Sequence, residues 1–159
     1  AVNAGLGWIG RQSLLISPKF GSFILLGEIV IDDIPDQYDT PYLDNGCKGC
    51  RRCIEACPAS AINNDLTIDT RRCISCRTVE VENNSEVTLN GWIFGCDECQ
   101  SCCPHNLKSP MHTNPDFDTI VSPPTRGEWE EMDEGRFIDL FGSTPLKRAG
   151  IERIKRSLE

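Results

Sequence analysis

The sequence lacks any apolar run long enough to cross a membrane, since a transmembrane helix needs about 20 consecutive apolar residues. The longest apolar stretch, residues 23–31, is interrupted by Gly27 and Glu28. Positive charge is scarce as well, because 16 lysines and arginines face 24 acidic residues, for a formal net charge of −8. Such a chain does not hold nucleic acid through bulk charge, so any contact of this kind must depend on local basic patches.

The sequence also lacks a visible secretory signal, and it begins with Ala1 rather than with methionine. Residues 1–10 have no leading strand or helix of their own, so we expect a fragment with a further segment upstream. Its 159 residues suffice for one ordinary domain, or for a domain with an extension. The hydrophobic share of 39% is enough to build a core.

Ten cysteines are the most informative feature that is present. The first group consists of Cys47-x2-Cys50-x2-Cys53-x3-Cys57 and the proline that follows it. The second consists of Cys96-x2-Cys99-x3-Cys103, again followed by proline. The first spacing is that of bacterial ferredoxins, in which the fourth cysteine of a motif binds the other cluster of a pair. The pattern therefore predicts two 4Fe-4S clusters that share ligands across the two groups.

Aligning the two Cys-Pro endings assigns the ligands. Cys103 then matches Cys57, and the ligand missing from the second group comes from Cys73, which lies upstream of it. The crossed-ligand rule gives the first cluster Cys47, Cys50, Cys53 and Cys103. It gives the second cluster Cys57, Cys73, Cys96 and Cys99. Cys76 and Cys102 are left without a role.

Two other kinds of cysteine site stay open. An even number of cysteines suits a disulfide scaffold, and CxxC pairs occur in structural zinc sites. The cluster spacing and the repeated Cys-Pro ending favour iron and sulfur over both. Cys102 could also replace Cys103, because Cys96-x2-Cys99-x2-Cys102 has ligand spacing too. We favour Cys103 because the proline after it matches the first group.

A glycine motif, Gly5-x-Gly7-x-x-Gly10, fits the dinucleotide-binding fingerprint letter for letter. That site needs a helix after the motif, whereas residues 13–16 have the composition of a strand. A nucleotide site is therefore disfavoured. The glycines fit equally well with a tight turn that packs Trp8 into the core, or with a backbone that closely approaches another cofactor.

The apolar pattern predicts two antiparallel strands over residues 13–17 and 22–31, joined by a turn. Helical periodicity predicts two amphipathic helices over residues 128–140 and 145–158. The fold class is α+β, with a ferredoxin-like two-cluster domain between an N-terminal β-hairpin and C-terminal helices. The predicted parts are residues 1–46, 47–110 and 111–159.

Several sequence segments together resemble the epoxyqueuosine reductases, the cobalamin and iron–sulfur enzymes of queuosine synthesis in tRNA. They are residues 4–10 (AGLGWIG), 14–22 (LLISPKFGS), 72–75 (RCIS), 94–100 (FGCDECQ) and 141–150 (FGSTPLKRAG). The resemblance covers nearly the whole chain. It implies that residues 1–46 are the end of a cobalamin-binding domain and a linker, that residues 47–110 form the dicluster domain, and that the rest is an extension.

The resemblance also implies an activity and its cofactors. Two 4Fe-4S clusters would deliver single electrons to cob(II)alamin, for the reductive removal of the epoxide oxygen of epoxyqueuosine. The enzyme would be a cytoplasmic monomer with no membrane partner. Its partners would be a low-potential electron donor and tRNA that has a G-U-N anticodon with epoxyqueuosine at the wobble position.

By resemblance, the cobalamin contacts of this chain are Arg11, Ser22, Leu26, Ser75 and Asp97. The family commonly has lysine and asparagine where this chain has Arg11 and Gln12, which changes the donor geometry at that contact. The general-acid aspartate of the family would precede Ala1, so no catalytic residue is expected within this chain.

Two other functions fit part of the pattern. A dicluster ferredoxin-like electron carrier would need the clusters but not the glycine loop or the hairpin. A related corrinoid-dependent reductase of a small molecule would not need the closing phrase of residues 143–149. Five C-terminal cations are candidates for contact with the tRNA backbone: Lys147, Arg148, Arg153, Lys155 and Arg156.

Overall fold

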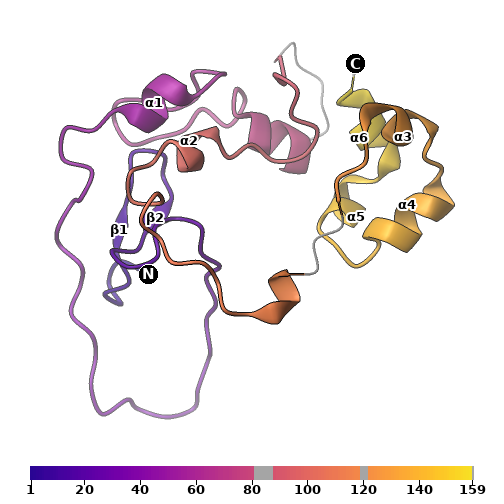
Figure 1. The fold of residues 1–159 in the computed structure, drawn as a ribbon. Coiled ribbons are helices and arrows are strands. Elements are labelled where there is room, and N and C mark those ends of the chain that lie inside the picture. Colours follow the sequence, from indigo (N-terminus) through magenta and orange to yellow (C-terminus); the bar gives the residue numbers. More distant parts are fainter. Residues whose placement is uncertain (81–87, 119–121, 159) are drawn as a thin grey trace. The chain divides into compact units, whose positions relative to one another are not determined.

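The computed structural model describes residues 1–80, 88–118 and 122–158. The chain forms two compact units, shown in Figure 1. Unit 1 contains Ala1–Ile68 and Glu98–Met111, and unit 2 contains Asp69–Asp97 and His112–Glu159. The chain thus leaves unit 1 and returns to it. The division into three consecutive parts that the sequence suggested stays a prediction. None of the helices in the described ranges is long and apolar enough to cross a membrane.

Unit 1 begins with a short hairpin. Strand β1 (Trp8–Ile9) pairs antiparallel with strand β2 (Leu15–Ile16), and Trp8 lies opposite Ile16. Gly7 has a φ of +153°, and a Cβ there would overlap the carbonyl oxygen of Ile16. The glycine motif therefore permits a close approach between two backbones of the hairpin. The residues after the motif form strand, as their composition predicted, and Trp8 is buried.

The prediction of a second strand over residues 22–31 is wrong. Beyond β2 the chain makes one isolated antiparallel bridge between Ser17 and Gly21, and it then runs as a wide loop without helix or strand (Figure 1). Leu25 and Val30 in this stretch are 87% and 96% exposed. A strand needs a neighbour that takes up its backbone hydrogen bonds, and no part of the chain that the structure describes pairs with this stretch.

Two short helices of unit 1 carry cysteines. Helix α1 (Arg52–Ala56) contains Cys53, and helix α2 (Glu98–Ser101) contains Cys99. The two helices contact each other, and they lie near the hairpin in Figure 1. The small core of this unit consists of Trp8, Ile16, Cys47 and Cys103, with Tyr42 packed against it. Cysteines are therefore part of the core itself.

Unit 2 is helical. It contains the π-helix η1 (Cys76–Glu80), the 3-10 helix η2 (Pro115–Phe117), α3 (Arg126–Glu131), α4 (Glu134–Phe141), α5 (Leu146–Ala149) and α6 (Ile151–Arg156). Both predicted C-terminal helices are thus broken in two. Asp133 starts α4 by accepting a hydrogen bond from the backbone of Arg136 at 2.8 Å, so it caps a new helix. Gly150, with a φ of +76°, separates α5 from α6.

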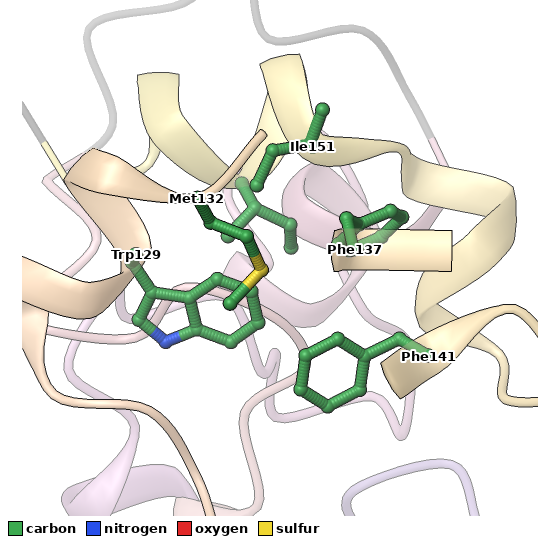
Figure 2. Packing of buried hydrophobic residues seen from close by; sticks show 6 residues of the cluster. Trp129, Met132, Phe137, Phe141 and Ile151 are labelled. Carbon is green, nitrogen blue, oxygen red and sulfur yellow. The ribbon is translucent and has the colours of Figure 1, made fainter. Parts of the chain in front are cut away.

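The breaks let the short helices surround one apolar core, shown in Figure 2. Its buried members are Trp129, Met132, Phe137, Phe141, Ile151 and Ile154. Trp129 stacks on Phe141 with ring centroids 5.2 Å apart. Helix η1 is tied to the same core, because Arg153 donates a hydrogen bond to the carbonyl of Val79 at 3.3 Å.

Candidate metal centre

Four predicted ligands converge on one pocket of unit 1. They are Cys47, Cys50, Cys53 and Cys103, the set that the spacing assigns to the first cluster. The pocket is small and partly open to solvent. Five further residues line it: Arg11, Gln12, Arg52, Pro104 and His105. Segments about fifty residues apart in sequence thus meet around a space lined with thiols.

The first three cysteines are positioned by a tight turn that runs into a helix. The backbone of Cys50 donates a hydrogen bond to the carbonyl of Cys47 at 2.8 Å. Lys48, inside this turn, has a φ of +42°, a conformation that L-residues seldom adopt. Cys53 lies in the first turn of α1 and is buried. The turn therefore directs three successive cysteines to one side.

The fourth cysteine arrives from the end of α2. The backbone of Cys103 donates to the carbonyl of Gln100 at 3.0 Å, and Pro104 then stops the helix from continuing. Because α2 contacts α1, Cys103 comes to lie against the first motif. It is 6% exposed and packs in the same core cluster as Cys47.

The electrostatics of the pocket require a positive partner for the thiolates. Burial raises the pKa of the Cys53 thiol to about 11, and the neighbouring Cys102 and Cys47 add to the shift. A bound metal reverses this preference, because it stabilises the deprotonated ligand. Two buried donors of the pocket, Arg11 Nε and Gln12 Nε2, have no hydrogen-bond partner among the residues that the structure describes. Thiols, cationic side chains and free donors together fit an anionic iron–sulfur cluster.

The cysteines of the pocket are arranged neither as a disulfide pair nor as the ligands of one ion within the described ranges. The four pocket cysteines are free thiols. Within the described ranges, no three cysteine, histidine or acidic residues are gathered as the ligands of one ion. Zinc holds all its sulfur ligands at about 2.3 Å, whereas a cubane takes one thiolate at each of its four irons, so its cysteines stand further apart.

Cys102 lies close to the pocket but is not among the residues that line it. Its Sγ contacts the carbonyl oxygen of Cys99 at 3.6 Å. Burial raises its pKa, and the nearby Cys103 and Cys50 raise it further. The lining of the pocket thus supports Cys103 as the ligand, and the choice between the two neighbours stays a prediction.

The ligands predicted for the second cluster are divided between the units. Cys57 and Cys99 belong to unit 1, and Cys73 and Cys96 belong to unit 2. Cys57 Sγ accepts a hydrogen bond from the backbone of Ala61 at 3.2 Å. The backbone carbonyl of Cys73 accepts a hydrogen bond from the backbone of Arg77, in η1, at 3.0 Å. The second ligand set stays a prediction.

Of the five predicted cobalamin contacts, three lie in unit 1. Arg11 donates to the carbonyl of Lys48 at 3.1 Å, so its guanidinium reaches the cysteine turn. The Ser22 hydroxyl is buried and donates to Gln100 Oε1 at 2.9 Å. Leu26 is 58% exposed. The other two, Ser75 and Asp97, lie in unit 2. These five positions also stay predictions.

Two further pocket residues, Gln12 and His105, are neither predicted cluster ligands nor predicted cobalamin contacts. His105 contacts the carbonyl oxygen of Gly46 at 3.3 Å, and its ring meets Trp8 edge-on with centroids 4.9 Å apart. His105 directly follows Cys103 and Pro104 in sequence, which brings it to the pocket, and four thiols leave it unneeded as a ligand. Gln12 lies between β1 and β2, and the folding of this hairpin brings it to the pocket. The spacing of the cysteines therefore could not indicate its place.

Known proteins support this interpretation of the pocket. Residues 46–106 match the family described as a 4Fe-4S double cluster binding domain, which confirms the predicted kind of cluster. The epoxyqueuosine reductase of Cyclobacterium marinum is 39% identical over 162 residues, covering 99% of this chain and 52% of that protein. The chain therefore spans about half the length of the curated relatives it matches.

Two solved structures are similar over 99% of the chain. An epoxyqueuosine reductase from Streptococcus thermophilus gives a TM-score of 0.78 at 33% identity, with 42% of that chain covered. A crystal structure of epoxyqueuosine reductase with an epoxyqueuosine-modified tRNA-Tyr stem loop gives a TM-score of 0.86 at 26% identity, with 43% covered. The similarity thus extends beyond the cluster domain to the hairpin and the C-terminal helices.

Proposed function

Since this chain is a homologue of part of the epoxyqueuosine reductases, we propose that it is the cluster-bearing part of a reductase that converts epoxyqueuosine to queuosine at the tRNA wobble position. The observation that carries the proposal is the pocket where Cys47, Cys50, Cys53 and Cys103 meet, inside a double-cluster domain. The similarity over 99% of the chain favours this function over a plain electron carrier, which needs neither hairpin nor closing segment.

The four pocket cysteines would hold the first 4Fe-4S cluster, and Cys57, Cys73, Cys96 and Cys99 the second. The clusters would supply one-electron transfer in two successive steps. Arg11 and Arg52 line the pocket and would offset part of the negative charge that four thiolates bring. The burial of Cys47, Cys53 and Cys103 would keep bulk water from most of the first cluster.

We propose cobalamin as the further cofactor, held in part by Arg11, Ser22, Leu26, Ser75 and Asp97. When bound, it would supply the low-potential metal centre at which the epoxide is reduced. Removing the epoxide oxygen as water consumes two electrons and two protons, so a low-potential donor must reduce the clusters twice per turnover. The hydroxyl of Ser22 is already held by Gln100 and Asn106, which would fix its orientation toward the cofactor.

The proposed substrate is tRNA that has a G-U-N anticodon with epoxyqueuosine at the wobble position. A related enzyme has been crystallised with an epoxyqueuosine-modified tRNA-Tyr stem loop, which supports this choice. We place the enzyme in the cytoplasm as a monomer. The net charge of −8 means that tRNA must be held by local cations of the whole protein rather than by bulk charge.

The test uses the full-length protein that contains this chain, reconstituted anaerobically with iron, sulfide and cobalamin and supplied with a low-potential reductant. We expect conversion of epoxyqueuosine to queuosine in tRNA, measured by mass spectrometry of the nucleosides. The Cys50→Ser variant should lose the conversion and serves as the control. Reduction of a small molecule, with the tRNA left unchanged, would instead identify a related corrinoid-dependent reductase.

A further inference from the structure

Gln12 follows the glycine motif and is almost completely buried, with 1% of its surface exposed. Its side chain lines the same pocket as the four cysteines. Its Nε2 has no hydrogen-bond partner within the part of the chain that the structure describes. A buried amide donor without a partner is destabilising, and nearly all such groups in folded proteins are satisfied. A hydrogen-bond acceptor bound in the pocket would therefore satisfy Gln12 Nε2.

The hairpin is built so that Gln12 can occupy this place. Gly10 lies beneath it, and a Cβ there would come within 2.5 Å of Gln12 Oε1 and 2.6 Å of Ile16 Cδ1. The backbone of Gly10 also donates a hydrogen bond to the carbonyl of Leu14 at 2.8 Å, which closes the turn around Gln12. The third glycine of the motif thus makes room for the amide.

The lining of the pocket indicates the kind of acceptor. Among the side chains that line the pocket, the two guanidinium groups only donate hydrogen bonds, whereas the four cysteine sulfurs and the His105 ring can accept them. His105 already directs one ring nitrogen to the carbonyl of Gly46, so the sulfurs are the main acceptors. We propose that Gln12 Nε2 donates an N–H···S hydrogen bond to a thiolate or sulfide of the first cluster. This inference rests on the ligand set under the proposed function, and it assigns the glycine hairpin a role in controlling that cluster.

The hydrogen bond has a direct electrochemical consequence. A reduced cluster has one more negative charge than the oxidised cluster, so a donor to its sulfur stabilises the reduced form more strongly. Hydrogen bonds to sulfur are one of the main determinants of cluster reduction potentials. Gln12 therefore raises the reduction potential of the first cluster, so this cluster accepts an electron more readily than it would without the hydrogen bond.

The test compares reduction potentials in reconstituted protein by EPR-monitored redox titration, with iron content measured alongside. The signal of the first cluster is identified as the one lost in Cys50→Ser. Gln12→Met keeps the length of the side chain and removes the donor. At the wild-type midpoint potential we expect about tenfold less reduced first cluster relative to oxidised, a shift of about 59 mV for one electron. The second cluster should be unaffected.

The matched control is Ser17→Ala in the same hairpin. Ser17 is buried and accepts hydrogen bonds from the backbone of Lys19 and Phe20, but it is not among the residues that line the pocket. Both potentials should keep their wild-type values in this variant. A shift as large as that in Gln12→Met would show that the hairpin acts through packing alone and would overturn the inference.

A second variant covers loss of the cluster. If Gln12→Met loses iron, Gln12→Asn, which keeps an amide donor, should retain it. Iron loss from both variants would show that the side chain only fills space. Full iron content with unchanged potentials in Gln12→Met would mean that water satisfies the amide, and would overturn the inference alone. A wild-type protein without a cluster in this pocket would overturn the proposed function as well.

Discussion

At the scale of single residues, the cysteines differ sharply in what they can contribute. Four of them line the pocket around a common space. Cys102 belongs to the same unit but does not line the pocket, and Cys76 belongs to unit 2. Burial raises the pKa of Cys76, and the nearby Cys73 and Glu80 raise it further, which favours the neutral thiol. A partly buried neutral cysteine behaves as a small apolar side chain. Its removal should leave the metal content unchanged.

The first prediction concerns these ligands. Cys50→Ser and Cys99→Ser should each remove one cluster, leaving about four of about eight iron atoms per chain, because a serine oxygen is a poor substitute for thiolate. Cys76→Ser and Cys102→Ser serve as matched controls and should keep the full iron and acid-labile sulfide content. Loss of a cluster in Cys102→Ser together with retention in Cys103→Ser would contradict the ligand assignment.

The second prediction concerns the glycine motif. Gly7→Ala should destabilise the hairpin by more than about 1 kcal/mol, because a Cβ would strike the backbone of Ile16 and φ lies in the region that favours glycine. Gly27→Ala, in the exposed loop with nothing within 4 Å of the new Cβ, is the control and should be nearly neutral. Thermal unfolding of the two reconstituted variants measures the difference, and equal melting temperatures would contradict it.

At the scale of secondary structure elements, the ends of the helices are determined by local chemistry. Thr125 and Glu128 form a capping box at the start of α3, in which each side chain accepts a hydrogen bond from the backbone of the other. Gly150 ends α5, because its positive φ is incompatible with a continuing helix. Capping residues and a glycine at the helix ends therefore determine where the helices break.

The third prediction concerns the capping box. The backbone N–H and the hydroxyl of Thr125 hold the pKa of Glu128 below its usual value. A lowered folded-state pKa means that the carboxylate stabilises α3 above its ordinary pKa of about 4.3, and that this stabilisation is lost as pH falls through the lower, folded-state pKa. The carbon-13 shift of the Glu128 carboxyl should titrate below that ordinary value. In Thr125→Ala the midpoint should rise toward it, and an unchanged midpoint would contradict the prediction.

The fourth prediction concerns the C-terminal cations. Arg148 contacts Glu80 at 2.6 Å, and Arg153 donates a hydrogen bond to the carbonyl of Val79. Both therefore have a structural partner, so the test is restricted to Lys147, Lys155 and Arg156. Replacing these three by alanine should weaken tRNA binding by the full-length protein and flatten its salt dependence, by up to about two to three units of log–log slope. The single-turnover rate at saturating tRNA should not change.

The control for this variant removes three cations that face carboxylates elsewhere: Arg51, Arg71 and Arg126. It lowers the net charge by the same amount, so any general effect of charge on tRNA binding appears in both variants. Equal losses of affinity in the two variants would exclude Lys147, Lys155 and Arg156 from the RNA site.

At the scale of the whole molecule, the fifth prediction concerns cobalamin. The full-length protein should bind cob(II)alamin base-off, detected by EPR. Asp97→Phe should weaken that binding while the iron content stays at about eight per chain, since Asp97 is not a predicted cluster ligand. Asp65→Phe, at an exposed acidic position in unit 1, is the control. Unchanged affinity for cobalamin in Asp97→Phe would exclude this residue from the cofactor site.

The sequence by itself determined what depends on neighbours along the chain. The spacing of Cys47, Cys50 and Cys53 sets a turn and a helix start that direct thiols to one side, so the kind of cluster could be predicted. The hydrogen bonds that start α3 likewise lie within four residues of one another. Local contacts of this kind cost little chain entropy when they form, so the neighbouring sequence is sufficient to predict them.

Only the tertiary structure decided which distant segments meet. It set α1 against α2, and it paired β2 with β1 instead of with residues 22–31. It also placed Gln12 in the pocket, which no spacing could indicate. The physical reason is that strand pairing and burial depend on the partner that is available in space, and a run of apolar residues such as 23–31 fits several partners equally well.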